Sequence, residues 1–524
     1  MGSETIQFSP GLCYVVSMRP TLSAFFVLFI AACASAQPSQ QADQPQRPPN
    51  VVILYGDDVG FGDVGVYGSK LIPTPRIDAL AAQGLRFTDG HCAAATCTPS
   101  RYSMLTGEMA FRQPGTGIAA PNSNSLIKAD RFTLADLFKQ AGYSTAVIGK
   151  WHLGLDDEQP IQWNGTIDPS PEAIGFDHHF ILPTTNDRVP SVYVSGGKVL
   201  NLDPNDPITI SPKPLGDDVP GTAYPNGRTN PETMTNLVGD HQHACTVTNG
   251  IGRIWFMKGG KAALWKDEDV ADDFVREAGK WIEANKDKPF FLFFPTSDIH
   301  VPRYPHKRFW GKSELGLRGD AMVSFDWSCG AILDVLEKHG LAENTIVILG
   351  SDNGPVYDDG YKDGTETRKA NAPSDRGHFG AGPYRGGKYS IYEGGTRTPF
   401  IVRWPGKVEP GVSEALFSQT DLMGSFAAML DQEIPKGEAI DSRDELDTLL
   451  GKDKVGSDVI LVQTNNKSFA MRYKQWKFIP GKQPQVYDLS KDIGEKNNLA
   501  KSNPEMTAKL AEMMQKYRQQ GLNE

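Results

Sequence analysis

Four strand-length runs of apolar residues, each ending abruptly in polar residues, constrain the fold of this 524-residue chain more than any other feature. The runs cover residues 50–55, 144–148, 289–294 and 345–349. Their apolar character is continuous rather than alternating, which is typical of strands buried on both faces of a parallel sheet. Helical patterns at residues 133–141, 267–286 and 322–339 supply the crossovers that parallel strands require. We therefore predict an α/β fold with a large, mostly parallel central sheet flanked by helices.

The residues that follow these runs are of the types that carry chemistry. In open α/β sheets, ligands collect at the carboxyl ends of the strands. Four distant segments would therefore deliver their polar side chains to one edge of the sheet, although any single one could be only a solvated strand end. These residues are Asp57, Asp58, Lys150, His152, His300, Asp352 and Asn353.

The acidic members of this set indicate a metal site. Asp57, Asp58, Asp352 and Asn353 offer only oxygen ligands, which suit a hard divalent cation better than zinc. Three carboxylates would repel one another unless a cation lay among them. We expect Ca²⁺ rather than Mg²⁺ because the ligands are numerous and all come from the protein. No His-x-x-x-His or Cys-x-x-Cys pair favours a zinc centre.

The pentapeptide CTPSR at residues 97–101 gives a lone cysteine a chemical setting. Pro99 is suited to the first turn of a helix, where its missing N–H costs nothing. Residues four apart share a helix face, so Arg101 should point back toward Cys97. The helix N-terminus favours an anion at this point. The pattern predicts a reactive centre facing a small oxyanion; a buried structural cysteine beside a helix cap is the alternative.

Basic residues balance the acidic group. Lys150 and His152 are two apart and lie on the same side if the strand conformation persists. Lys388 follows two glycines in a turn that lets a cation approach a ligand closely, unless it is simply a solvated loop lysine. The net charge of −10 argues against a nucleic acid partner. Any anionic substrate must therefore be met by a local basic cluster.

The N-terminus predicts export to the periplasm or outside the cell. Residues 1–36 have the features of a signal segment, with a true start possible at Met18 and an apolar run too short to span a bilayer. Cys33 ends a segment that resembles a lipoprotein box, so lipid anchoring through Cys33 is an alternative, and it is how the processed protein would contact a membrane. An uncleaved anchor is a third possibility. Residues 37–48, rich in Gln and Pro, predict a disordered linker.

Cysteine content limits the role of disulfides. Removal of the signal segment leaves four cysteines: Cys92, Cys97, Cys245 and Cys329. If Cys97 is chemically modified, three remain and at most one intramolecular disulfide can form. The chain is therefore not a disulfide scaffold.

These motifs resemble those of the formylglycine-dependent (type I) sulfatases. CTPSR is followed by Leu105-Thr106-Gly107, and further blocks match in the family's order from about Pro49 to the C-terminus. The blocks are residues 50–60, 149–154, 300–302, 351–354, 386–388, 394–400 and 487–499. Residues 240–243, 258–261 and 267–269 resemble the branch that contains arylsulfatases and N-acetylgalactosamine-6-sulfatases.

The resemblance implies an alkaline-phosphatase-like sandwich. The catalytic α/β domain would span residues 49–409, and residues 410–524 would form a smaller C-terminal α+β subdomain with an antiparallel sheet. Within it, residues 470–479 have the pattern of a hairpin and residues 504–519 that of a closing helix.

The resemblance also implies roles for the site residues. Cys97 would be oxidised to formylglycine (3-oxoalanine) by a formylglycine-generating or sulfatase-maturing enzyme. One Ca²⁺ would be held by Asp57, Asp58, Asp352, Asn353 and modified residue 97. The sulfate pocket would comprise Arg101, Lys150, His152, His300 and Lys388. In such enzymes a hydroxyl of the aldehyde hydrate attacks sulfur, His300 with Lys388 protonates the leaving oxygen, and His152 takes a proton from the second hydroxyl so that sulfate departs.

The substrate class follows less directly. An exported enzyme of this branch is expected to act on a sulfated polysaccharide or glycan with galactose- or galactosamine-type sugars. Candidate sugar contacts are His241, His243 and His378, each of which could equally be a structural loop histidine. One alternative is a phosphate or phosphonate ester hydrolase of the alkaline-phosphatase-like group, which the cysteine of CTPSR and the shortage of zinc ligands disfavour. Another is a non-catalytic glycan-binding relative, although none of the expected polar residues is missing.

Overall fold

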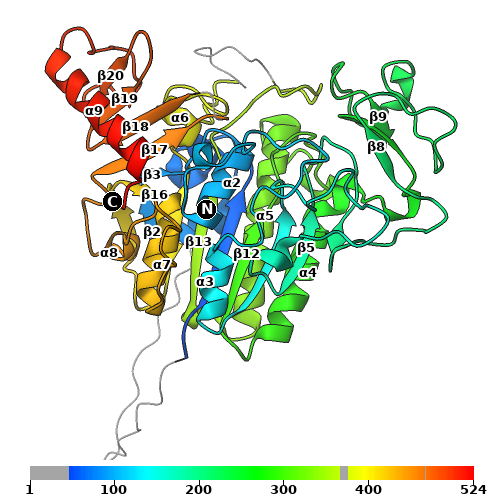
Figure 1. Cartoon of the computed structure of the whole chain (residues 1–524), viewed down its shortest axis with the longest axis horizontal. Helices are drawn as coiled ribbons and strands as arrows, with labels where there is room; N and C mark the ends of the chain where they lie inside the picture. Colours follow the sequence, from blue (N-terminus) through cyan, green and yellow to red (C-terminus); the bar gives the residue numbers. More distant parts are fainter. Residues whose placement is uncertain (1–46, 366–375, 466–467, 524) are drawn as a thin grey trace, which may run out of the picture. The chain divides into compact units, whose positions relative to one another are not determined.

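The computed structural model describes residues 47–365, 376–465 and 468–523, and its central feature is a ten-stranded sheet between two layers of helices (Figure 1). The expected signal segment, with Met18 and Cys33, and all but the last two residues of the expected linker lie outside the described residues. Among the described helices, none has the length and apolar character needed to cross a bilayer.

The four apolar runs form the centre of this sheet, as predicted. They are β1 (Asn50–Gly56), β4 (Ser144–Lys150), β12 (Phe290–Pro295) and β13 (Thr345–Ser351). They lie in the order β13-β1-β12-β4, and every pair is parallel. Val51 of β1, for example, is in register with Phe291 on one side and Ile346 on the other. The carboxyl ends of all four strands therefore meet at one edge.

Shorter strands extend the sheet on both sides. Beyond β13 lies β14 (Phe400–Arg403), which is antiparallel to β13 and to the next strand, β2 (Leu85–Phe87). The outermost strand on that side is β15 (Gly411–Ser413). On the other side β5 (His178–Leu182) is parallel to β4 and leads to β6 (Val194–Ser195) and β7 (Lys198–Val199). The sheet is thus mixed but mostly parallel at its centre.

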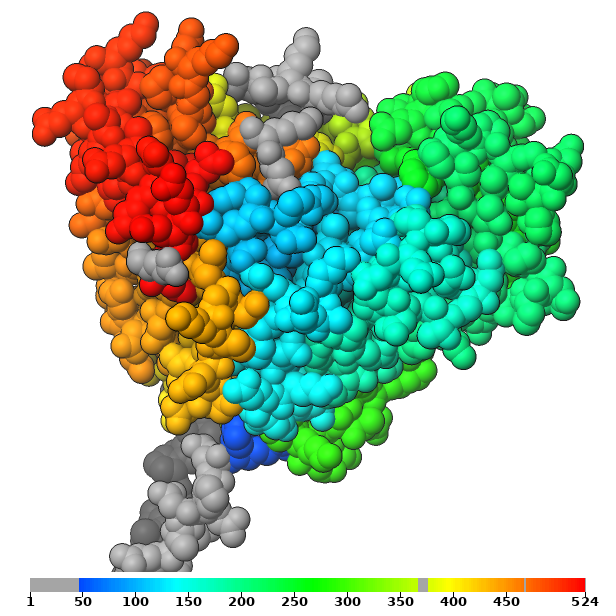
Figure 2. Space-filling model, in the orientation of Figure 1, coloured from blue at the N-terminus to red at the C-terminus, as the bar shows by residue number. Residues whose placement is uncertain are grey.

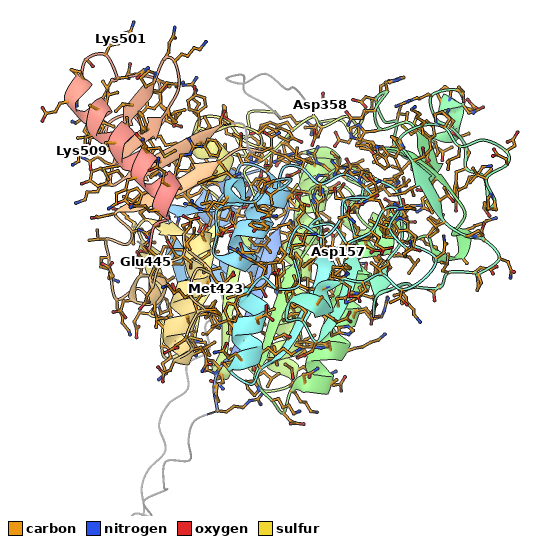
Figure 3. The ribbon with its side chains drawn as sticks, in the orientation of Figure 1. Asp157, Asp358, Met423, Glu445, Lys501 and Lys509 are labelled. Atoms are coloured by element: carbon orange, nitrogen blue, oxygen red, sulfur yellow. The ribbon has the colours of Figure 1, made fainter. Side chains whose placement is uncertain are left out.

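Helices cover both faces of the sheet because successive residues of a strand point to opposite faces. Val52 and Leu54 pack with α1 (Pro75–Ala82), α4 (Val270–Asn285) and α5 (Gly316–Lys338). Val51 and Ile53 pack on the other side. The helices there are α2 (Cys97–Thr106), α3 (Leu134–Gln140) and α7 (Leu422–Leu430), the last carrying Met423 (Figure 3). Helices α3, α4 and α5 are the three predicted crossovers.

A separate four-stranded antiparallel sheet lies near the C-terminus. It consists of β17 (Val459–Gln463), β18 (Phe469–Tyr473), β19 (Trp476–Ile479) and β20 (Gln485–Asp488). Helix α9 (Pro504–Gln520) closes over it, with Leu510 and Met514 packed among residues of β17 to β20 (Figure 1). The predicted hairpin and closing helix are therefore present.

The smaller sheet begins later than the boundary expected at residue 410. Strand β15 pairs with β2 of the large sheet, and α7 packs in the large core through Leu422 and Phe426. Figure 2 shows the orange and red C-terminal residues next to the blue residues at about position 100 of the chain. The segment after residue 410 therefore first adds a strand and a helix to the large sheet and its helical layer, and the smaller sheet begins only at β17.

The remaining elements are short. Helices α6 (Glu393–Thr396) and α8 (Leu446–Leu449) are single turns. Two-stranded pairs are formed by β3 (Gly90–His91) with β16 (Phe417–Ser418), β9 (Thr246–Thr248) with β10 (Ile251–Arg253), and β8 (Thr209–Ser211) with β11 (Phe256–Lys258). All four cysteines within the described residues are free and buried.

Candidate active site

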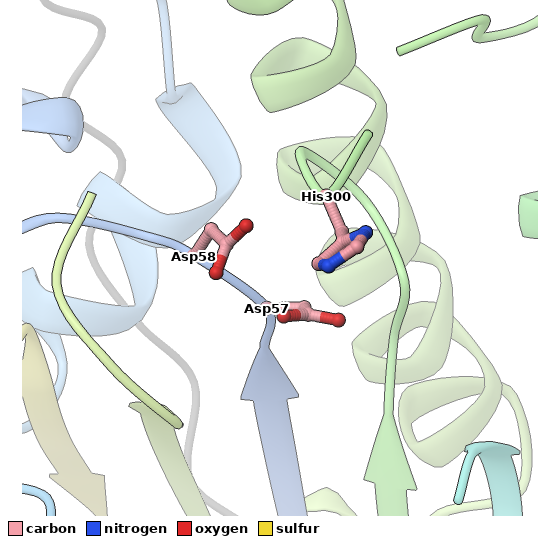
Figure 4. Close-up of side chains that lie close together, drawn as sticks. All are labelled: Asp57, Asp58 and His300. Atoms are coloured by element: carbon pink, nitrogen blue, oxygen red, sulfur yellow. The ribbon is translucent and has the colours of Figure 1, made fainter. Parts of the chain in front are cut away.

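The acidic residues expected at the carboxyl edge lie together there. Asp57 and Asp58 follow β1 directly, and Figure 4 shows His300 facing them from the segment after β12. Asp57, Asp58 and His300 each place a potential ligand atom within 4.8 Å of the others. Asn353 Nδ2 donates to Asp58 Oδ1 over 2.7 Å, and Asp352 Oδ1 accepts from the Asp58 backbone N–H over 3.2 Å. The sheet edge has therefore assembled all four predicted oxygen ligands.

The pKa values of these carboxyl groups show that their negative charge is incompletely balanced. Burial, with the Asp352 carboxylate adding to it, raises the pKa of Asp57 to about 6, even though Lys150 donates a hydrogen bond to Asp57 Oδ2. Burial also raises the pKa of Asp58 despite its ion pair with Lys388 over 2.9 Å. A further positive charge beside these groups would stabilise their ionised forms.

Two buried oxygens at this point suit a metal ion. Within the described part of the chain, Asp57 Oδ1 and Asn353 Oδ1 have no hydrogen-bond partner. Buried acceptors are normally satisfied, so such a pair needs an explanation. Carboxylate and amide oxygens are the ligands that hard divalent cations prefer. The oxygen donors therefore fit the cation expected from the sequence, and His300, expected in the sulfate pocket and as a proton donor, lies beside them.

Cys97 is the first residue of α2, a helix whose ten residues are all buried. Its Sγ lies 3.2 Å from His152 Nδ1. Burial raises the pKa of the Cys97 thiol, although Lys150 and Lys388 act to lower it. A thiol is nucleophilic mainly as the thiolate. An unmodified Cys97 would therefore be a poor nucleophile in this position.

Arg101 is on the expected side of α2 but is engaged with acidic residues. Its Nε and Nη2 donate to Asp352 Oδ2 over 2.9 and 2.8 Å, and its Nη1 donates to the Lys150 carbonyl over 2.9 Å. The Arg101 side chain is fully buried. The structure therefore places Arg101 as a fixed partner of Asp352 beneath residue 97.

The strand conformation that would place Lys150 and His152 on one side does not persist as far as His152. Strand β4 ends at Lys150, and His152 has a left-handed backbone with φ of 55°. Gly149 has φ of 139°, and a Cβ there would collide with the Pro295 carbonyl oxygen, so the strand is already distorted before Lys150. The turn nevertheless brings Lys150 to Asp57 and His152 to Cys97.

His152 is held by a residue that the sequence did not single out. Arg188 Nη1 lies 2.7 Å from His152 Nε2 and donates to the Ala119 carbonyl over 2.6 Å. Burial, followed by the charges of Arg188 and Lys150, holds the pKa of His152 well below its usual value. If Nε2 donates to Ala119 O, 3.1 Å away, Nδ1 faces Cys97 as an acceptor; if Nε2 accepts from Arg188, Nδ1 carries the proton.

His300 and Lys388 lie on the other side of the acidic group. His300 Nδ1 donates to the Val301 carbonyl over 2.7 Å, which leaves Nε2 as the acceptor of the neutral ring. Burial, then Lys150 and Lys388, holds the pKa of His300 well below its usual value. The Lys388 side chain is only 2% exposed, so it is not a solvated loop lysine, and its ion pair with Asp58 raises its pKa.

The three candidate sugar contacts lie in different settings. His243 is buried, with Nδ1 2.8 Å from Asp240 Oδ1 and Nε2 3.5 Å from Asp187 Oδ2. His241 is exposed. His378 Nε2 lies 2.7 Å from Asp63 Oδ1, and Asp63 also pairs with Arg318. His243 is thus joined through Asp187 to the segment that carries Arg188.

The sequence could have indicated Asp187 and Arg188 only if β5 had been recognised as a fifth strand followed by polar residues. They lie in the loop after β5, whose sequence HHFIL begins with two histidines and is too short and mixed to stand out as an apolar run. Arg188, His243 and His300 all act to lower the pKa of Asp187, which lies well below its usual value. Asp187 and Arg188 are therefore charged groups beside His152 and His300.

The fold and this site define a class of protein. A buried residue 97 lies among lysines, histidines and carboxylates, at the carboxyl edge of a mostly parallel sheet, where a small oxyanion and a cation can be held side by side. This arrangement suits a metal-assisted hydrolase of oxyanion esters.

Comparison with known proteins gives the family. The family described as Sulfatase matches residues 49–432. N-acetylgalactosamine-6-O-sulfatase of Bacteroides thetaiotaomicron is 46% identical over 490 residues, which cover 90% of this chain and 93% of that protein. Human arylsulfatase A is 30% identical and covers 89% of this chain and 87% of its own length. The chain therefore belongs to the sulfatase family and is a sulfuric ester hydrolase, which confirms the predicted family and enzyme class.

Solved structures agree with this assignment. A structure connected with the metabolism of multiple glycosaminoglycans by Bacteroides thetaiotaomicron has a TM-score of 0.85 at 46% identity, covering 90% of this chain and all of that chain. The fold alone is shared with a phosphonate monoester hydrolase of Agrobacterium radiobacter, with a TM-score of 0.56 at 15% identity, covering 90% and 96% of the two chains. The predicted fold class is confirmed, and the family rather than the fold separates sulfatase from phosphonate hydrolase.

Proposed function

We propose that this protein is an exported, Ca²⁺-dependent glycan sulfatase that removes 6-O-sulfate from galactosamine-type sugars. The single observation that carries the chemistry is that buried Cys97, 3.2 Å from His152 Nδ1, lies at the sheet edge where, among the described residues, Asp57 Oδ1 and the Asn353 amide oxygen have no hydrogen-bond partner. The substrate rests on the 46%-identical N-acetylgalactosamine-6-O-sulfatase. Export rests on the features of residues 1–36, with lipid anchoring through Cys33 as the alternative.

The residues that would hold Ca²⁺ are Asp57, Asp58, Asp352, Asn353 and residue 97. A calcium ion bound there would offset the charge of the sulfuryl oxygens. Lys150 and Lys388 already pair with Asp57 and Asp58, so these lysines can turn toward an anionic ester once a cation neutralises the carboxylates. The site would then bind a cation and an anion together.

Formylglycine formed from Cys97 by a maturation enzyme would supply the nucleophilic oxygen. The raised pKa of the thiol supports this, because unmodified Cys97 would be almost entirely protonated at neutral pH. Its position at the N-terminus of α2 favours negative charge on the attacking group.

His152 and His300 would each carry out a different proton transfer. His152 Nδ1 lies nearest to residue 97 and can accept a proton there when Nε2–H donates to the Ala119 carbonyl. His300 can donate to the leaving oxygen once Nε2 gains a proton. An anionic ester beside Lys150 and Lys388 would favour this protonation, because these two cations hold the pKa of His300 down.

A group of charged side chains, Asp187, Arg188 and His243, supports a sugar substrate. These charged groups are linked to one another and reach His152 through Arg188. Sugar hydroxyls are recognised by fixed hydrogen-bonding groups of this kind, which also penalise an analogue that lacks the partner hydroxyl. We expect these three residues to contribute to the specificity for the sugar.

Assay of defined sulfated saccharides tests the proposal. Protein with formylglycine at residue 97, verified by peptide mass spectrometry, should release sulfate from N-acetylgalactosamine-6-sulfate, and a chelator should abolish release until Ca²⁺ is restored. The matched controls are the 4-sulfated sugar and the 6-phosphate of the same sugar. Equal or faster release from either control, or full activity with an intact thiol at residue 97, would contradict the proposal.

A further inference from the structure

Two sequence blocks that the proposed chemistry does not use, residues 394–400 and 487–499, meet in the structure around Glu393. Glu393 opens α6 and is completely buried. Its Oε1 accepts from Lys477 Nζ over 2.8 Å, and its Oε2 accepts from Arg472 Nη1 over 2.7 Å. Its backbone N–H donates to Glu495 Oε2 over 2.7 Å. Glu393 therefore joins the segment before β14 to strands β18 and β19 of the smaller sheet.

The segment of residues 385–397 that contains Glu393 also touches three parts of the active site. Lys388 N–H donates to the Pro355 carbonyl over 2.9 Å, close to Asp352 and Asn353 in sequence. Tyr389 N–H donates over 2.7 Å to the carbonyl of Ala95, two residues before Cys97. Gly354 N–H, next to Asn353, donates to the Gly395 carbonyl over 2.9 Å. The position of this segment is thus coupled to Lys388, to the metal ligands and to the start of α2.

Close packing makes this coupling stiff. A Cβ at Gly354 would collide with the Gly394 carbonyl oxygen, so the backbones of the two segments are in direct contact. Gly394 N–H in turn donates to the Arg385 carbonyl over 2.8 Å, which closes residues 385–394 into a loop around Lys388. Interiors packed this closely transmit small displacements.

A second tie to the smaller sheet lies on the other side of Lys388. Arg385 Nη1 donates to the Glu495 carbonyl over 2.8 Å, and its guanidinium lies over the Tyr392 ring at 3.6 Å. Tyr392 OH donates to Gln485 Oε1 of β20 over 3.0 Å. The loop that carries Lys388 is therefore held by the C-terminal part at both of its ends.

We propose that Glu393, anchored by Lys477 and Arg472, is a positioning residue that fixes Lys388 for sulfate-ester hydrolysis. The smaller sheet would thus be part of the catalytic apparatus without touching the substrate. This inference rests on the proposed function only in assigning Lys388 to the sulfate. The same cluster does not suit a metal ion, although Asp89, His91 and Glu393 lie close together, because Arg472, Arg397 and Lys477 already neutralise its carboxylates.

Kinetics of Lys477→Met test the positioning role. We expect kcat to fall about 10- to 100-fold with a small change in KM, because a displacement of about 1 Å at a catalytic group costs this much. Lys477→Arg keeps the charge and should restore most of kcat. Arg385→Met, which cuts the second tie without leaving a buried carboxylate unpaired, should lower kcat in the same direction and serves if Lys477→Met does not fold.

The matched control is Arg112→Met. Arg112 ties the large domain to α9 through the carbonyls of Tyr517 and Arg518 and pairs with Asp441, but has no part in the loop around Lys388. This variant should lower the Tm and leave kcat near the wild-type value. A comparable fall of kcat in Arg112→Met would mean that any loosening of the smaller sheet slows the enzyme, and would overturn the specific role of Glu393 and Lys477.

A double-mutant cycle with Lys388→Met separates positioning from general damage. If Lys477 acts through Lys388, then Lys477→Met should have no effect on kcat in the Lys388→Met background beyond about twofold, which is the usual error of such cycles, whereas independent effects would add in full. The same loss in both backgrounds would overturn the inference. Failure of wild-type protein to hydrolyse any sulfated sugar would contradict the proposed function instead, so the two failures are distinguishable.

Discussion

Two buried clusters of charge in this molecule resemble each other in composition but differ in how their charges are balanced. We call them the site cluster and the inter-sheet cluster. The site cluster comprises Asp57, Asp58, Lys150, Asp352, Asn353 and Lys388. The inter-sheet cluster comprises Asp89, His91, Glu393, Arg397, Arg472 and Lys477. Each contains carboxylates and cations shielded from water.

The pKa values of the carboxyl groups separate the two clusters. Burial raises the pKa of Asp57 and Asp58, and their lysines do not fully offset it. In the inter-sheet cluster burial acts in the same direction, but the neighbouring cations together outweigh it. Arg472 and Arg397 lower the pKa of Asp89, and Arg472 and Lys477 lower the pKa of Glu393. The first cluster therefore has capacity for another cation, whereas the second is neutralised within the protein. The residue composition of a buried charged cluster alone would therefore not distinguish a binding site from a cluster that only stabilises the fold.

The largest effect should come from Cys97→Ala. Loss of the side chain that becomes the nucleophile should lower kcat by roughly 10⁴-fold or more, as removal of a nucleophile does in other hydrolases. The folded state should persist because alanine at the start of α2 removes only one buried sulfur. Sulfate release and the far-ultraviolet circular dichroism spectrum check both parts. Residual activity within tenfold of the wild type would show that residue 97 is not the nucleophile.

Lys150→Ala and His300→Ala should follow, with losses of roughly 10²- to 10³-fold in kcat. Lys150 supplies charge beside Asp57, and His300 faces the same group from the segment after β12. Steady-state rates on the natural sulfated sugar provide the measurement, since an activated aryl ester needs less help from a proton donor. Near-wild-type rates would remove the variant's residue from its assigned role.

Calcium should distinguish the two clusters directly. Wild-type protein should be stabilised by roughly 3 kcal/mol when Ca²⁺ is about 100-fold above its Kd. Asp352→Ala should lose most of this increase in Tm, because Asp352 accepts from Asp58 N–H within the site cluster and from Arg101 beside it. Asp89→Asn, its counterpart in the inter-sheet cluster, should lower the Tm but keep the response to Ca²⁺. An unchanged response in Asp352→Ala would exclude Asp352 from the ligand set.

The smallest effect should be a pH-dependent one at Glu495, beside the inter-sheet cluster. Burial, together with the Glu393 carboxylate, raises the pKa of Glu495 to about 7 despite the opposing charge of Lys477. The folded protein then binds more protons than the unfolded chain between about pH 4.3 and 7, so this group's contribution to stability is lost as the pH rises through that range. Glutamine does not ionise, so Glu495→Gln removes the free-energy cost of ionising this buried carboxyl group.

Thermal unfolding at two pH values measures this effect. The stability of Glu495→Gln relative to the wild type should improve by about 2–3 kcal/mol between pH 5 and pH 8. The amide oxygen can still accept from Glu393 N–H, which Glu495 Oε2 accepts in the native protein. A difference between the two proteins that does not change with pH would show that Glu495 is already ionised at pH 5.

Much of the fold and of the site could be predicted where the residues adjacent in sequence already indicate the local structure. The four apolar runs became adjacent parallel strands, and the polar residues that end them became the site cluster. Arg188 and Asp187 were missed because β5 is short and mixed in character, so no apolar run marked the strand end before them. The strand argument for Lys150 and His152 failed because Gly149 and His152 adopt left-handed backbone conformations that residue types alone do not announce.

The sequence by itself determined the central sheet, the CTPSR pentapeptide at the start of a helix and the group of oxygen-bearing side chains at the strand ends, because hydrophobic periodicity and residue chemistry are properties of local residue order. Only the tertiary structure decided how these charges are shared. Arg101 pairs with Asp352, and Glu393 pairs with Lys477, across long stretches of chain. The pKa of a buried group depends on which charges surround it in space, and those neighbours come from segments that only folding brings together.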